Sequence, residues 1–99
     1  MRDGQITVIA LIKAKEGMVD IVKRELLSLI ESTRKESGCI GYDLNQSTET
    51  AGDFMFYETW ASKEALDKHL AMPYIQNIIK RSPEIFSEPI RVTIWKKES

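Results

Sequence analysis

The sequence predicts an α+β fold in which a four-stranded antiparallel sheet carries helices on one of its faces. Three observations lead to this prediction. Four segments show the alternation of β-strands, the two stretches between them show helical periodicity, and together the segments follow the order β-α-β-β-α-β. This order is the ferredoxin-like split βαβ arrangement. It leaves the second face of the sheet without helices.

The first strand is expected from Ile6 to Ile12, where apolar residues occupy both alternating sides, so both faces of this strand are predicted to be buried. Glu16-Gly17 then interrupts the chain. From Met18 to Thr33, apolar residues recur at helical spacing and charged residues fill the opposite side. One long amphipathic helix that stops near Gly38 is therefore expected.

A β-hairpin is expected next. Its first strand, residues 39–46, places Ile40, Tyr42 and Leu44 on one face. Its second strand covers residues 54–60, and one face of it carries Phe54, Phe56, Glu58 and Trp60. The apolar and aromatic character of both sides predicts that both faces of this second strand are covered.

A helix split in two and a closing strand complete the predicted order. Ser62 is a good N-cap for a short helix, and Pro73 stops this helix and begins another. The second helix is expected to loosen or kink at Ser82-Pro83. Residues 88–96 are expected as a closing strand, with alternation from Ile90 onward.

Length and composition point to one small domain over residues 1–99 that binds a small molecule. The chain has 99 residues, with 14 Lys and Arg against 15 Asp and Glu, so no basic surface for nucleic acid or an anionic membrane is expected. It contains one cysteine, Cys39, and no long apolar stretch. We expect a cytoplasmic protein without a disulfide, a bound metal or another cofactor.

The helix-free face of the sheet predicts self-association. This face would carry apolar and aromatic side chains from at least the first and third strands. A monomer seldom exposes a contiguous apolar patch of more than several hundred Å². A homodimer with the two sheets packed face to face is therefore expected.

His69 is the candidate catalytic residue. It is the only histidine of the chain, and it falls at the edge of the apolar stripe of the short helix, three residues after Leu66. Histidine titrates near neutral pH and is a natural general base for a phenol or enol. A buried structural histidine is the alternative interpretation at this stage.

Three aromatic residues are candidate substrate-binding residues, namely Trp60, Tyr42 and Tyr74. Trp60 ends a strand and could stack on a flat ring, while the tyrosine hydroxyls could orient an oxygen of the substrate. Core packing is the alternative for each. Glu58 shares a strand face with Trp60. An interface or structural salt bridge to a cation such as Arg91 is expected for it, and a position at the sheet margin is the alternative.

The whole chain resembles the antibiotic biosynthesis monooxygenase family, which includes quinol monooxygenases. The resemblance lies in the opening strand, the Glu36-Ser37-Gly38-Cys39-Ile40-Gly41-Tyr42 junction, the Tyr57-Glu58-Thr59-Trp60 strand, the helix around His69, and Pro73-Tyr74. It implies a dimeric α+β barrel with a mostly apolar pocket between the sheet and the helices of each subunit.

The resemblance also implies a reaction that needs neither metal nor flavin. A deprotonated quinol or anthrone would give its electrons directly to O2, with His69 as the proton acceptor and Trp60 and Tyr42 shaping the site. Haem-degrading relatives have their haem-ligating histidine near Ile79, which cannot bind iron, so haem degradation is not expected. A non-catalytic or stress-associated ligand-binding dimer and an isomerase for a small carbonyl or signalling metabolite remain the alternatives.

Overall fold

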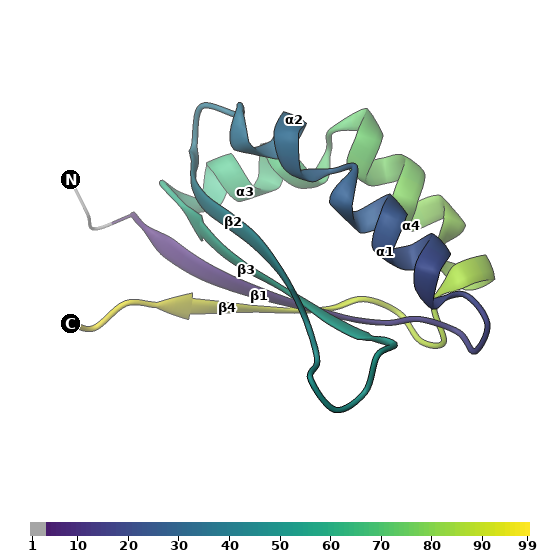
Figure 1. The fold of residues 1–99 in the computed structure, drawn as a ribbon. Helices are drawn as coiled ribbons and strands as arrows, with labels where there is room; N and C mark the ends of the chain where they lie inside the picture. The colour runs from purple at the N-terminus through teal and green to yellow at the C-terminus, as the bar shows by residue number, and fades with distance from the viewer. Residues whose placement is uncertain (1–3) are drawn as a thin grey trace.

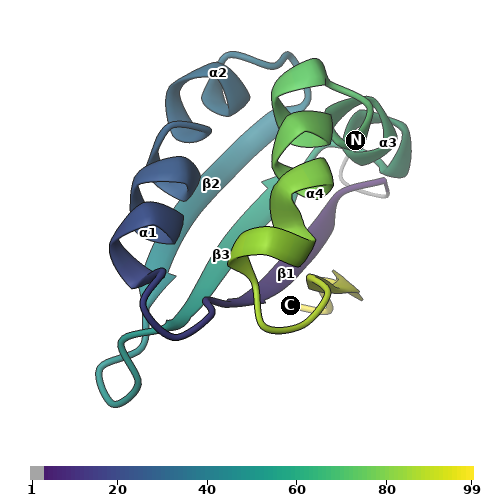
Figure 2. The same cartoon turned by 90° about the vertical axis from the view of Figure 1, so that its right-hand side faces the viewer.

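The computed structural model describes residues 4–99, and the first three residues of the expected domain lie outside this range. Figures 1 and 2 show one sheet with the helices gathered on one of its faces. The elements are β1 (Ile6–Lys13), α1 (Val19–Leu27), α2 (Ile30–Arg34), β2 (Cys39–Gln46), β3 (Asp53–Trp60), α3 (Lys63–Leu70), α4 (Pro73–Ile85) and β4 (Arg91–Lys96). The strands pair antiparallel in the order β2-β3-β1-β4. The predicted ferredoxin-like fold is confirmed.

The prediction of one long first helix is wrong, because the helix breaks at Ser28 and Leu29. The Ser28 hydroxyl donates to the carbonyl of Glu25 at 2.6 Å, and the Leu29 amide bonds to the carbonyl of Leu26, only three residues back. Such bonds compete with the α-helical pattern and tighten the turn. The break divides the segment into α1 and α2, and α2 packs over β2 (Figure 2).

Strand register places the core side chains on the helix-covered face of the sheet. Val8 of β1 lies opposite Glu58 of β3 and Ile94 of β4, and directly paired residues project to the same side. The opposite face carries the exposed side chains of Leu11, Tyr57 and Trp95. The expected burial of both faces of β1 and β3 is therefore not present in a single chain.

A β-bulge also changes the prediction for Ile40. The pairing of β2 with β3 shifts between Cys39 and Gly41, and Ile40 is exposed instead of sharing the buried face with Tyr42. A bulge inserts one unpaired residue and so interrupts the alternation of faces. Regular alternation resumes at Tyr42, which is buried.

The predicted starts of the two later helices are confirmed. The Ser62 hydroxyl accepts a hydrogen bond from the Ala65 amide at 3.1 Å at the start of α3, and Pro73 occupies the first turn of α4. α4 continues through Pro83 to Ile85. None of the helices within residues 4–99 has the length and apolar character needed to cross a membrane.

Candidate active site

A cavity of about 330 Å³ lies between the sheet and the helices. Most of its walls are aliphatic side chains from β1, α1, the break between α1 and α2, α3, α4 and β4. Its polar lining residues are Tyr42, Glu58, His69 and Ser82. Ile79 and Val92 line the cavity and are also exposed, so it reaches the surface between α4 and β4. Such a cavity suits a small, mostly apolar ligand held by a few polar groups.

His69 lies on the cavity wall, and one of its ring nitrogens is hydrogen-bonded to a buried carboxylate. Its Nδ1 is 2.9 Å from Oε2 of Glu36, and the side chains of these two residues are only 4% and 8% exposed. The hydroxyl of Tyr74 donates to the same carboxylate oxygen. A carboxylate only accepts hydrogen bonds, so Nδ1 carries the proton in the neutral ring and Nε2 keeps its lone pair.

Close packing around Gly38 brings Glu36 to the histidine. A Cβ atom at Gly38 would lie 2.3 Å from the Cβ of Ala65 on α3, so a side chain does not fit at this position. The carbonyl of Gly38 also accepts a hydrogen bond from the Ala61 amide at 2.8 Å. The segment that follows α2 is thus held against α3, the helix that carries His69.

Two aromatic rings fix the orientation of the imidazole. The ring of Trp60 lies 4.6 Å from that of His69, and the ring of Tyr42 meets it edge-on at 5.5 Å. Tyr42 lines the cavity, whereas Trp60 and Tyr74 do not. The substrate-binding role expected for these three residues stays a prediction. Trp60 packs against His69, and Tyr74 donates a hydrogen bond to Glu36, the partner of His69.

The expected salt bridge between Glu58 and Arg91 is absent from the described residues. Glu58 lies on the helix-covered face, where its Oε1 accepts a hydrogen bond from Nε1 of Trp60 at 2.8 Å. Arg91 is exposed and pairs in register with Leu11, on the other face of the sheet. Burial, together with the negative charge of Glu36, raises the pKa of Glu58 to about 7.

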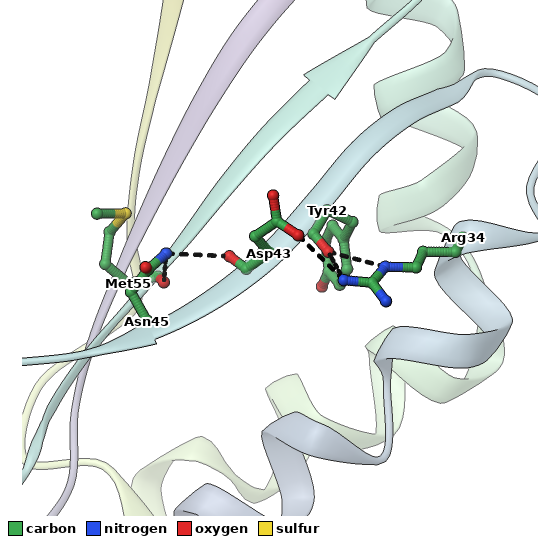
Figure 3. Close-up of polar contacts among 5 residues, drawn as sticks. All are labelled: Arg34, Tyr42, Asp43, Asn45 and Met55. Carbon is green, nitrogen blue, oxygen red and sulfur yellow. Dashed lines mark hydrogen bonds and ion pairs between the residues drawn. The ribbon is translucent and has the colours of Figure 1, made fainter.

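Tyr42 is held at both its side chain and its backbone. Its ring stacks on Phe56 at 4.5 Å, and burial together with the charge of Glu58 raises the pKa of its hydroxyl. Figure 3 shows the guanidinium of Arg34 at the end of α2 donating to the carbonyl of Tyr42 at 2.9 and 3.1 Å and to Asp43 at 3.0 Å. These bonds tie α2 to the edge strand that carries Tyr42.

The same figure shows how the hairpin beyond Tyr42 is braced. The side-chain amide of Asn45 lies 3.4 Å from the carbonyl of Asp43 on its own strand and 3.4 Å from that of Met55 on β3. These three residues belong to the helix-free face of the sheet. They support the strand pair and lie outside the cavity lining.

Sequence reasoning missed the role of Glu36. The residue lies 33 positions before His69, in a short connection, and no spacing pattern links the two. Leu26 and Leu29 also line the cavity. Among residues 4–99, no group of three or more His, Cys, Asp or Glu side chains is arranged to hold a metal ion.

The sequence and the fold match a known class of proteins. The family model described as "Antibiotic biosynthesis monooxygenase" matches residues 5–81. The chain belongs to the antibiotic biosynthesis monooxygenase family.

Two relatives are similar over most of this chain. "Uncharacterized protein sll1783" from Synechocystis sp. is 33% identical over 95% of this chain. The matched region covers 64% of that relative, which is less than two thirds of its length. "Putative monooxygenase Rv0793" from Mycobacterium tuberculosis is 30% identical over 90% of this chain and 87% of its own length.

Solved structures are similar over nearly the whole chain. The structure of protein SO0527 from Shewanella oneidensis has a TM-score of 0.89 and 34% identity, covering 95% of this chain and 91% of its own. The structure of Rv0793 also has a TM-score of 0.89, covering 96% of both chains. The family and the fold are thus supported by sequence and by structure.

Proposed function

We propose that this protein is a cofactor-independent monooxygenase that oxidises a small quinol or anthrone-like ring with O2, with His69 as the general base. The observation that carries the proposal is the hydrogen bond between His69 Nδ1 and Glu36 at 2.9 Å on the wall of a largely apolar cavity. It leaves Nε2, which has no hydrogen-bond partner within residues 4–99, as the acceptor of the substrate proton. Family membership and the name of the Rv0793 relative support oxygenase chemistry.

The reaction begins when Nε2 takes the proton of a phenol or enol. The carboxylate of Glu36 then faces a positively charged imidazolium across the same hydrogen bond and stabilises it. The electron-rich substrate anion transfers electrons to O2. One oxygen atom joins the ring carbon and replaces two hydrogens, and the other leaves as water, so an anthrone becomes an anthraquinone and no external reductant is required.

The aliphatic walls support this chemistry because they limit the contact of the reacting atoms with bulk water. Charge that develops in such a site is stabilised by fixed partners such as Glu36 rather than by solvent. A volume of about 330 Å³ is at the lower end for ligand pockets, so the proposed substrate is small.

The proposal is tested by O2 uptake with a panel of reduced quinols and anthrones. His69→Ala should reduce uptake to the spontaneous rate, and added imidazole should restore part of it by occupying the vacated space. Lys68→Ala, an exposed neighbour on the same helix, is the matched control and should behave as wild type. Equal uptake by His69→Ala and wild type would remove His69 from the mechanism. Absence of uptake above the spontaneous rate would favour the ligand-binding or isomerase alternatives.

We also propose that the helix-free sheet face is covered by a second copy of the chain. Leu11, Tyr57 and Trp95 are exposed there, together with the half-buried Ile9 and Met55. A monomer rarely leaves so many large apolar side chains together in water. A homodimer that buries this face follows.

A further inference from the structure

Glu58 is a buried carboxyl group that the proposed mechanism does not use. It is 4% exposed and lines the same apolar cavity as His69. No Lys, Arg or His side chain within residues 4–99 forms an ion pair with it. An ionised carboxylate in such surroundings is costly, because neither water nor a cation compensates for the lost hydration.

The geometry fixes one oxygen of Glu58 and leaves the other available. Oε1 accepts the Trp60 Nε1 hydrogen at 2.8 Å, whereas Oε2 has no hydrogen-bond partner among the described residues. The indole of Trp60 also packs against the imidazole of His69, so Glu58 and His69 both contact one indole ring. Two groups able to exchange protons therefore reach the cavity close to each other.

The surroundings of Glu58 favour its protonated state, although the hydrogen bond from Trp60 acts in the opposite direction. Tyr42 lies directly opposite it on β2 and presents a neutral hydroxyl, not a positive charge. His69 comes from α3, and its Nδ1 is engaged by the Glu36 carboxylate, whose charge opposes a second negative charge nearby. Burial acts in the same direction and is the larger cause.

We propose that Glu58 is the ligand's hydrogen-bond donor, giving its carboxyl proton from Oε2 to a carbonyl or phenol oxygen of an uncharged aromatic ligand. Ionisation of Glu58 removes this donor and places a negative charge where the ligand oxygen would lie. The cavity thus selects rings with an oxygen acceptor over hydrocarbons. In the proposed oxidation, which this inference deepens, His69 accepts a proton from one substrate oxygen while Glu58 holds an oxygen.

Binding of an inert ligand pair tests the inference apart from catalysis. 1-Indanone carries one carbonyl and indane is the same ring system without it, and neither molecule ionises between pH 5.5 and pH 9. Isothermal titration calorimetry on the full chain would give both Kd values across this pH range. For wild type we expect the Kd of 1-indanone to rise about tenfold or more as the pH passes through neutrality, because the donor is lost. The Kd of indane should stay constant.

Two variants separate a donor from a structural anchor for Trp60. Glu58→Gln keeps a group that accepts from Trp60 and an N–H that can donate to the ligand, so it should bind 1-indanone tightly at every pH. Glu58→Leu fills the space without a donor and should bind 1-indanone no better than indane. Circular dichroism confirms folding of each variant, and if Glu58→Leu does not fold, Glu58→Gln alone decides.

The inference is overturned by any of three results. These are absence of 1-indanone binding at pH 5.5, equal affinity for the two ligands at pH 5.5, and a pH dependence in Glu58→Gln that equals that of wild type. Its failure is distinguishable from failure of the proposed function. The predicted indanone profile without O2 uptake would refute only the oxygenase, and His69-dependent uptake without this profile would refute only the donor.

Discussion

Substituting Glu58 by Gln should change the pH dependence of folding stability. The carboxyl group is 4% exposed, and its pKa rises from the ordinary 4.5 to about 7. Between these values the folded chain keeps a proton that the unfolded chain loses, so wild type loses stability as the pH rises through this window. At about 1.4 kcal/mol for each pH unit, the loss is about 3 kcal/mol above pH 7. A glutamine at this position does not titrate, so Glu58→Gln does not lose stability in this way.

Urea denaturation of both proteins at pH 4.5, 6, 7.5 and 9 measures this effect, since the free energy of unfolding is obtained at each pH. The stability of Glu58→Gln relative to wild type should increase by about 3 kcal/mol across the series. Glu64→Gln, on the exposed side of α3, is the control and should follow wild type. Parallel stability profiles for wild type and Glu58→Gln would refute the reasoning, because they would mean that Glu58 titrates alike in the folded and unfolded chains.

Three further predictions concern the supports of the site and the bare sheet face. Gly38→Ala should lower the free energy of unfolding by about 1–3 kcal/mol because its Cβ would meet Ala65, and adding Ala65→Gly should recover part of this loss in urea denaturation. Glu36→Gln should lower O2 uptake about tenfold or more, since the amide no longer fixes the tautomer of His69, and unchanged uptake would contradict this role. Leu11→Lys should convert the proposed dimer to a monomer in sedimentation equilibrium, and an unchanged mass would argue against this face as the interface.

The sequence by itself determined the order of the elements and most of their faces. Apolar alternation placed Phe56, Glu58 and Trp60 on one side of β3, and the Ser62 cap and Pro73 marked the boundaries of α3. These features depend on local periodicity and capping, which neighbouring residues specify almost alone. The sequence also singled out His69 because no other histidine exists in the chain.

Only the tertiary structure decided what surrounds these residues. The partner of His69 is Glu36, which lies in the short connection between α2 and β2. This connection approaches α3 because Gly38 packs closely against it. The partner of Glu58 is Trp60 rather than Arg91, because strand register places Arg91 on the other face of the sheet. Contacts between residues distant in sequence depend on register, bulges and close packing, and one-dimensional patterns carry little information about them. The hydrogen bond between His69 and Glu36, on which the proposed chemistry depends, is a contact of this kind.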